Sequence, residues 1–391
     1  MLNQEVYDKV VAKFAEKFGG KPEVVSYAPG RIEVLGNHTD YNEGYVFSAA
    51  IDKGTFFAVS PAADDKVTLV AIDMDETYET TLGAVAKVES GATWANYPLG
   101  TFNWLMGGEP ARAGKGFMAV FGGNIPLGAG LSSSAALEMA TALALQKVFG
   151  TKFDRTELAK IGQKAEHTFA GCPCGLLDQA SSMYGQAGAL VKSDFRTNEF
   201  ESVPMGDGVA FMMVKSNAKH ALVDGAYASR RQACEDAAKH FAGVLRKKVT
   251  HLRDVTMAEW VLYRGGLSET TARRAVHPIG EDERVLQGAA LLEKGDLQGF
   301  GALMYDSHES SRNWFENSCE ELDAIVDAAK AIPEVYGARL SGGGFGGSCC
   351  LLVDPAAADR ISAQITREYK AKFGDEPTCS LIKPSEGAHL V

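Results

Sequence analysis

One stretch, residues 117–150, limits what this chain can fold into more than any other. It opens with an apolar run that predicts a buried strand, and a glycine-rich turn follows. From Ser132 onward the composition predicts a helix, with serines at its start and Gly150 just past its end. A strand, a glycine turn and the open N-terminus of a helix together can bind a phosphate group. An ordinary buried helix with a serine cap has the same pattern, so other stretches must decide.

The overall charge of the chain excludes some classes of partner. Its 391 residues carry a formal net charge of -11 at pH 7, which argues against nucleic acid or an anionic membrane, because either partner favours a basic face. No apolar run approaches the length that spans a bilayer. The seven cysteines are scattered and the N-terminus lacks an uninterrupted apolar signal region, so we expect a reduced, cytoplasmic protein.

A polar insertion separates two strand-like runs near the N-terminus, between Gly36 and Gly44. A simple turn needs only one or two polar residues, whereas this many hydrogen-bonding groups favours recognition of a hydroxylated ligand. A polar surface loop is the alternative interpretation. The residues between the two glycines are Asn37, His38, Thr39, Asp40, Tyr41, Asn42 and Glu43.

Two acidic residues follow the central stretch at positions that favour chemistry. Glu166 lies beside the apolar face of a predicted helix that ends at Gly171. Asp178 stands at the predicted start of the next helix, where the macrodipole favours its charged form, although a plain N-cap is the commoner role for such an aspartate. Cys172 and Cys174 are too close for a zinc knuckle and no second pair follows, so we interpret them as structural.

A third glycine-rich stretch, residues 341–347, precedes a predicted strand. Its glycines match G-x-G-x-x-G formally, but the dinucleotide fingerprint requires a following helix, so that match is rejected. Neither the P-loop pattern nor the catalytic set of protein kinases is present, so any nucleotide site is of another kind.

Val6, Val10, Phe14 and Phe18 recur at helical spacing and predict a helix at the start of the chain. Residues 195–203 predict a strand, and a helix is expected from about residue 281 to residue 292. The composition shifts toward helices after Pro204, which predicts a domain boundary there.

Taken together, the three stretches resemble the galactokinase family, within the group of small-molecule kinases that includes homoserine, mevalonate and phosphomevalonate kinases. Residues 28–44, APGRIEVLGNHTDYNEG, resemble the galactokinase signature, and residues 126–136, PLGAGLSSSAA, are similar to the ATP-binding motif of the group. Residues 340–348, LSGGGFGGS, resemble its third motif. Three ordered motifs are far more specific than any one of them, and the resemblance covers nearly the whole chain.

The resemblance implies a two-domain α+β fold of the small-molecule kinase type. Residues 1–204 would form an N-terminal sugar- and ATP-binding domain, a mixed sheet with helices. Residues 205–391 would form a C-terminal domain with a ferredoxin-like layer, and the active site would lie in the cleft between them. The implied activity is ATP-dependent phosphorylation of the anomeric C1 hydroxyl of D-galactose. The implied partners are the sugar and MgATP, with no nucleic acid and no membrane, and the protein would be a monomer.

The resemblance also assigns roles to residues of this sequence. The ATP phosphates would lie on Gly128, Ala129, Gly130, Leu131, Ser132, Ser133 and Ser134. A Mg²⁺ ion would lie on Ser134 and Glu166, and the catalytic residues would be Asp178 and Arg31. The sugar would be bound by Asn37, His38, Asp40, Gly175, Asp178 and Tyr227. These residue types suit phosphoryl transfer, which needs positioning and neutralisation of charge, and a hydroxyl with a carboxylate suits Mg²⁺.

One residue departs from the family signature, which has Glu where this chain has Asn37. The family residue there would contact the primary hydroxyl of the sugar, so a galactose relative altered at C6, such as galacturonate, becomes an alternative substrate. Because no arginine or lysine stands in the loop to pair a carboxylate, galactose is favoured, and Asn37→Glu is expected to improve its turnover. A non-catalytic sugar and ATP sensor is the alternative of another class, which the intact Glu166 and Asp178 argue against.

Overall fold

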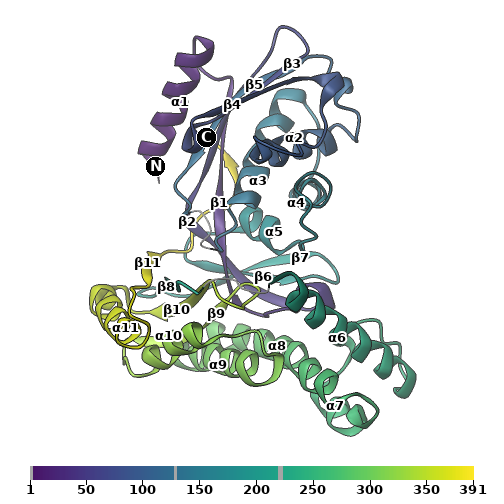
Figure 1. Cartoon of the computed structure of the whole chain (residues 1–391), viewed down its shortest axis with the longest axis vertical. Coiled ribbons are helices and arrows are strands. Elements are labelled where there is room, and N and C mark those ends of the chain that lie inside the picture. The colour runs from purple at the N-terminus through teal and green to yellow at the C-terminus, as the bar shows by residue number, and fades with distance from the viewer. Residues whose placement is uncertain (1–2, 127–129, 219–222) are drawn as a thin grey trace.

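The computed structural model describes residues 3–126, 130–218 and 223–391 and arranges them around two β-sheets (Figure 1). Among these residues the larger sheet has eight strands, in the order β12-β1-β2-β5-β3-β4, with β6 beside β2 and β7 beside β6. It is mixed, because β3 and β5 run parallel while the other pairs are antiparallel. Its strands are β1 (Val24–Leu35), β2 (Tyr45–Pro61), β3 (Lys66–Ala71), β4 (Glu76–Thr81), β5 (Phe117–Gly123), β6 (Ala189–Asp194), β7 (Glu199–Pro204) and β12 (His389–Leu390).

Helices cover both faces of the larger sheet because its central strands are apolar on both sides. On β2, Phe57 packs toward four helices on one face, while its neighbour Phe56 packs toward a single helix on the other. That single helix is α1 (Gln4–Phe18), which buries Val10 and Phe14 at the predicted helical spacing. The four helices are α2 (Asn96–Leu105), α3 (Ser133–Phe149), α4 (Arg155–Ala165) and α5 (Leu177–Tyr184).

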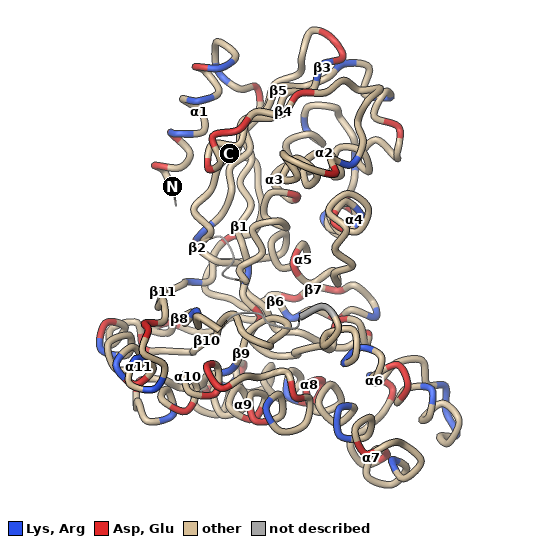
Figure 2. Tube along the Cα trace, in the orientation of Figure 1, with Lys and Arg blue, Asp and Glu red and all other residues tan. Residues whose placement is uncertain are grey.

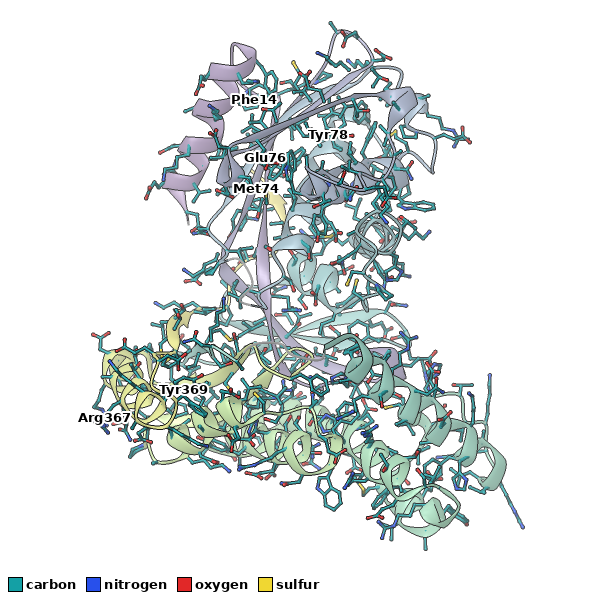
Figure 3. The ribbon with its side chains drawn as sticks, viewed as in Figure 1. Phe14, Met74, Glu76, Tyr78, Arg367 and Tyr369 are labelled. Carbon is teal, nitrogen blue, oxygen red and sulfur yellow. The ribbon has the colours of Figure 1, made fainter. Side chains whose placement is uncertain are left out.

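The smaller sheet is antiparallel, and within the described residues it has four strands in the order β11-β8-β10-β9. One face packs against α10 (Glu320–Lys330) and α11 (Ala358–Phe373). Figure 3 labels two residues of α11 that show its two sides: Tyr369 is 2% exposed in this core, while the Arg367 side chain is 72% exposed. The strands are β8 (Ala210–Lys215), β9 (Val335–Ser341), β10 (Ser348–Val353) and β11 (Thr378–Ile382).

A shared core joins the two sheets. Ile32 of β1 and Phe47 of β2 pack in one cluster with Phe211 and Met213 of β8. The same cluster includes residues of α8 (Glu269–Glu293) and α9 (Leu297–Ser310). The predicted two-domain α+β fold is confirmed, with β7 the last strand of the larger sheet before β8 opens the smaller one. The division after residue 204 stays a prediction, and β12 returns to the larger sheet at the end of the chain.

Two details of the predicted elements are wrong. The helix expected from about residue 281 begins at Glu269 and runs through Pro278, because it packs with α6 (Val223–Val244) and α7 (Met257–Tyr263) in a further core. That burial outweighs the hydrogen bond that proline cannot donate. The strand expected over residues 195–203 begins only at Glu199, because the preceding residues form the turn between β6 and β7.

The charges are spread over the whole surface. Figure 2 shows basic and acidic residues alternating along α1, α6 and α11, so these helices present no continuous basic face. The part of the chain that the structure describes includes no helix long and apolar enough to cross a membrane.

The packing of α1 on the sheet gives a stability prediction. Phe14 is 1% exposed and contacts the sheet, whereas Leu262 of α7 is 73% exposed. Phe14→Ala should therefore lower the free energy of unfolding by about 3–5 kcal/mol, through lost burial and the cavity left behind. Leu262→Ala is the control and should change it by less than about 0.5 kcal/mol. Urea unfolding of both variants measures this, and equal effects would contradict the packing.

Candidate active site

Two cavities adjoin where the larger sheet meets the smaller one, and they share two residues. The first has a volume of about 500 Å³ and is lined by β1, the 36–44 loop, the 172–178 segment, Tyr227 and the glycine loop at 342–343. The second has a volume of about 280 Å³ and is lined by the start of α3 and the turn before it. Arg31 and Asp178 line both cavities, so a ligand in one and a ligand in the other would meet at these two side chains.

Arg31 and Asp178 form an ion pair between β1 and the first turn of α5. Arg31 Nη2 and Nε lie 2.6 Å and 2.8 Å from Asp178 Oδ1. Arg31 Nη1 also donates to the carbonyl of Gly130 at 2.7 Å, and the Ser132 hydroxyl donates to Asp178 Oδ2. Asp178 does not cap its helix, because the N-cap residue is Leu176. Both oxygens of this carboxylate therefore accept hydrogen bonds, Oδ1 from Arg31 and Oδ2 from Ser132.

The start of α3 lines the smaller cavity. Ser132 is its N-cap residue and has a left-handed backbone with φ of 55°, and its side chain makes no capping hydrogen bond. The predicted serine cap is therefore wrong, because the Ser132 hydroxyl is directed to Asp178 instead. Ser133 and Ser134 line the cavity, and the free N–H groups of a helix start favour anions. The predicted phosphate residues Gly128 and Ala129 lie outside the described residues.

Glu166 lies next to the smaller cavity in an environment rich in carboxylates. Its Oε1 accepts a hydrogen bond from the Ser134 hydroxyl at 3.2 Å. Its Oε2 accepts from Gln179 Nε2 at 2.7 Å, and that amide nitrogen also donates to Glu138 Oε2 at 2.9 Å. Burial raises the pKa of Glu166 and Asp178 raises it further, while burial raises the pKa of Glu138 well above its usual value. The site has more negative than positive charge.

Ser134 and Glu166 offer two oxygen ligands to a cation. In the described parts of the chain, no group of three or more His, Cys, Asp and Glu side chains is arranged to hold a metal ion. A Mg²⁺ ion, however, commonly takes one or two protein oxygens and completes its octahedron with phosphate oxygens and water. The Ser134 hydroxyl and the Glu166 carboxylate are such a pair, so the donor set fits Mg²⁺ that arrives with a nucleotide.

His38 lies in the larger cavity with both ring nitrogens engaged. Its Nε2 donates to the carbonyl of Gly343 at 3.2 Å, so its Nδ1 accepts from the Tyr41 hydroxyl at 2.8 Å. Burial lowers the pKa of His38 to about 4, so the ring is neutral at pH 7. Its backbone has φ of 61°, a strained value for histidine, and its ring lies 5.1 Å from the Tyr227 ring.

Asp40 and Gly175 meet across the wall of the larger cavity. A Cβ at position 175 would lie 2.0 Å from Asp40 Oδ2, so only glycine leaves room for this carboxylate. Burial raises the pKa of Asp40 to about 6, and the charge of Glu33 adds to the effect. The structure thus brings together four predicted sugar residues, His38, Asp40, Gly175 and Tyr227, in one cavity.

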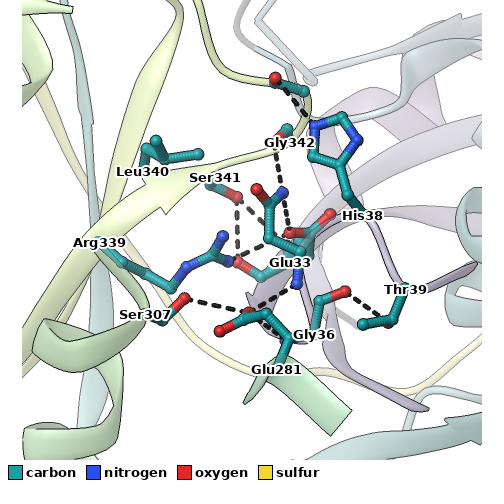
Figure 4. A network of polar contacts seen from close by, with 12 residues as sticks. Glu33, Gly36, His38, Thr39, Glu281, Ser307, Arg339, Leu340, Ser341 and Gly342 are labelled. Carbon is teal, nitrogen blue, oxygen red and sulfur yellow. Dashed lines mark hydrogen bonds and ion pairs between the residues drawn. The ribbon is translucent and has the colours of Figure 1, made fainter. Parts of the chain in front are cut away.

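Asn37 lies in the same cavity and contacts a polar network that the sequence did not predict. Figure 4 shows this network around Glu33 and Arg339. Its Nδ2 donates to Glu33 Oε1 at 2.8 Å and to the carbonyl of Gly342 at 2.7 Å. Arg339, which is fully buried, approaches the same Glu33 oxygen at 3.1 Å. The signal for Glu33 in the sequence is its charge: it stands two residues after Arg31 in an otherwise apolar strand.

Glu281 of α8 accepts hydrogen bonds from the backbone at the start of the 36–44 loop. Its Oε2 accepts the backbone N–H groups of Gly36 and Asn37 at 2.9 Å and 2.7 Å, and the Ser307 hydroxyl at 3.0 Å. Burial opposes its ionisation, but Arg284, His277 and Arg339 together outweigh burial and lower the pKa of Glu281 to about 2. No sequence pattern predicts this role, because the partners lie 244 and 245 residues away in the chain.

Comparisons with known proteins agree with this arrangement. The galactokinase galactose-binding signature matches residues 12–61, the GHMP kinases N terminal domain matches residues 96–186, and the GHMP kinases C terminal model matches residues 289–371. Galactokinase of Homo sapiens is 39% identical over 385 residues, which cover 97% of this chain and 95% of the human protein.

Solved structures match over nearly the full length. Galactokinase of Lactococcus lactis complexed with galactose superposes with a TM-score of 0.89 at 31% identity, covering 98% of this chain and 99% of that chain. Mevalonate kinase of Methanococcus jannaschii has a TM-score of 0.60 at 19% identity, covering 94% of this chain and 99% of that chain, and shares the fold.

The neutral, buried ring of His38 gives a pH prediction. Because its pKa falls from 6.5 to about 4 on folding, the unfolded chain takes up a proton between these pH values and the folded protein does not. This contribution to the free energy of unfolding is therefore complete above pH 6.5 and is lost as the pH falls to about 4. His38→Asn, which tolerates the positive φ, should reduce the slope of stability against pH in this window. Urea unfolding at a series of pH values measures it, and an unchanged slope would contradict the assignment.

Proposed function

The chain belongs to the galactokinase family and is an ATP-dependent sugar kinase, and on that premise we propose that it phosphorylates the anomeric C1 hydroxyl of D-galactose, giving galactose 1-phosphate and ADP. One observation carries the proposal: Arg31 and Asp178 line both the larger and the smaller cavity. A sugar in the larger cavity and the phosphates of ATP in the smaller one would meet at this ion pair.

The smaller cavity supplies the binding groups for the phosphates of ATP. The open start of α3 offers backbone N–H groups and a favourable dipole, and Ser133 and Ser134 line the space in front of it. Arg31, the cation among the described residues lining this cavity, is held there by Asp178 and the carbonyl of Gly130. These groups would hold the γ-phosphate and neutralise the charge that is spread over its oxygens during transfer.

Asp178 would receive the acceptor hydroxyl. Its carboxylate lies at the junction of the two cavities, so a C1 hydroxyl placed there can donate its proton toward Asp178 while its oxygen approaches the γ-phosphorus. Arg31 and Ser132 already hold the two oxygens of Asp178, which keeps the carboxylate in a single orientation. We therefore assign Asp178 both the positioning of the hydroxyl and the acceptance of its proton.

The remaining sugar contacts would come from the walls of the larger cavity. Asp40 and Tyr227 offer a carboxylate and a phenol hydroxyl, and Gly175 leaves the space in which Asp40 lies. His38 can serve a sugar hydroxyl only by exchanging one of its two present partners, Tyr41 or Gly343. Asn37 binds neighbouring protein groups through both ends of its amide.

We propose Ser134 and Glu166 as the protein ligands of a Mg²⁺ ion carried by ATP, because they are a hydroxyl and a carboxylate 3.2 Å apart beside the smaller cavity. When bound, the ion would shield phosphate charge and help to orient the γ-phosphate. The raised pKa of Glu166, caused by burial and by Asp178, supports this, since a cation there would offset the excess negative charge.

Two alternatives are less well supported. Galacturonate would bring a carboxylate into a cavity that already contains Glu33 and Asp40, where Arg31 is the cation among the described lining residues and is paired with Asp178. A non-catalytic sugar sensor would not need a carboxylate at the junction of the two cavities.

We also retain the expectations of a cytoplasmic monomer. The seven free cysteines support a reducing compartment, and sedimentation would test the oligomeric state.

Replacing the carboxylate at the junction tests the catalytic assignment. Asp178→Asn keeps the shape but removes the charge, so kcat should fall roughly a hundredfold or more while galactose still binds. Coupled ADP release with a panel of sugars measures turnover, and phosphorus NMR of the product locates the phosphate. The parent enzyme should release ADP with galactose and place the phosphate on C1. Near-normal turnover in the variant would refute the role of Asp178, and an inactive parent would favour the sensor.

The proposed metal ligands give a second test. Ser134→Ala and Glu166→Gln should each raise the Mg²⁺ concentration needed for half-maximal activity and weaken binding of MgATP more than binding of sugar. Glu138→Gln is the matched control, because Glu138 belongs to the same buried network but is connected to Ser134 only through Gln179 and Glu166. Its Mg²⁺ titration should overlay that of the parent. If the Glu166→Gln titration also overlays the parent, Glu166 is not a ligand.

A further inference from the structure

The larger cavity contains a carboxylate, Glu33, directly beside position 37. Asn37 stands where the family signature has Glu, yet Glu33 lines the same cavity and contacts Asn37 directly, with 2.8 Å between Asn37 Nδ2 and Glu33 Oε1. This part of the cavity therefore contains a carboxylate, but residue 33 supplies it instead of residue 37, and the amide of Asn37 lies beside it.

The position of Glu33 along β1 suits the far end of a hexose. Arg31 and Glu33 pair with Ala50 and Ser48 of β2 in regular register, so both side chains leave β1 on the same face. Two residues of a strand span about 7 Å, which is comparable to the width of a pyranose ring with its substituents. When the reacting hydroxyl lies at Arg31 and Asp178, the opposite end of the sugar therefore lies at Glu33.

The contacts of Glu33 leave one oxygen for a ligand. Its Oε1 holds two donors, Asn37 Nδ2 at 2.8 Å and Arg339 Nη1 at 3.1 Å. Its Oε2 accepts no hydrogen bond from the described residues, although the residue is only 5% exposed. Figure 4 shows the carboxylate beside the Arg339 guanidinium and next to the glycine loop. Because Glu33 lines the cavity, a hydroxyl of a bound ligand can donate to this oxygen without displacing a protein group.

We propose that Glu33, positioned by Asn37 and Arg339, accepts the hydrogen bond of the sugar's primary C6 hydroxyl and so determines the specificity of this enzyme for galactose. This inference rests on the proposed function, which orients C1 toward Asp178. Asn37 is then a positioning residue that fixes the carboxylate through its amide.

The same contacts revise the expectation for Asn37→Glu. A glutamate at position 37 would stand next to Glu33 and would face the carbonyl of Gly342 without a hydrogen to donate. Two carboxylates and a carbonyl would then repel one another in a buried place. The single change should therefore lower galactose turnover, and only the exchange of both residues restores a single carboxylate beside an amide.

The test compares galactose with 6-deoxygalactose, which lacks the C6 hydroxyl, in each variant. In the parent, galactose should be preferred in kcat/KM by roughly tenfold to a hundredfold, as expected for a hydrogen bond to a charged acceptor. Glu33→Gln should lose most of this preference through KM, and galacturonate should improve relative to galactose. The double variant Glu33→Asn, Asn37→Glu should recover most of the preference.

Glu281→Gln is the matched control, because Glu281 is also buried and holds the same loop without lining the cavity. It should lower activity on both sugars alike and keep their ratio. Because the ratio is taken within one variant, the folded fraction cancels. If Glu33→Gln does not fold, the double variant decides the matter.

An unchanged ratio in Glu33→Gln, or a ratio lost in the double variant, would overturn the proposal. Calorimetric binding of the two sugars separates this from failure of the proposed function, since it needs no turnover. A parent that binds galactose more tightly than 6-deoxygalactose but does not phosphorylate it would refute the kinase mechanism and leave the role of Glu33 standing.

Discussion

The ion pair between Arg31 and Asp178 is the interaction on which the rest of the site depends. Its two side chains are only 10% and 23% exposed, so the charges are strongly coupled and the loss of either would leave the other poorly compensated. The same guanidinium holds the carbonyl of Gly130, and the same carboxylate holds the hydroxyl of Ser132. The pair therefore sets where Gly130 and the start of α3 lie relative to the larger cavity.

The strand β1 connects this pair to the core of the protein. Arg31 and Glu33 face the larger cavity, while the alternate residues Ile32 and Val34 pack in the core shared by the two sheets. The strand β1 thus supplies Arg31 at one end of the larger cavity and Glu33 further along it. The same strand also supplies apolar side chains to the core that joins the two sheets. Arg339 of β9 reaches the same place from the smaller sheet, so the specificity for the sugar depends on both sheets being in contact.

Local patterns in the sequence predicted the features that local physics determines. The apolar spacing of α1, the strand before the glycine turn and the position of Asp178 in the first turn of a helix are all present. The resemblance of three motifs predicted the family, which the comparisons confirm. Contacts between distant segments were not predictable: Glu33 meets Arg339 across 306 residues, and Glu281 holds the 36–44 loop from α8. The serine cap of α3 failed for the same reason, because a distant aspartate takes the Ser132 hydroxyl.

The most direct test of the central claim is a crystal structure with galactose, Mg²⁺ and a non-hydrolysable ATP analogue. We expect the C1 hydroxyl oxygen within hydrogen-bonding distance of Asp178 and in line with the γ-phosphorus, with the triphosphate at the start of α3. A complex in which another hydroxyl of the sugar faces Asp178, or in which the triphosphate lies outside the smaller cavity, would contradict it.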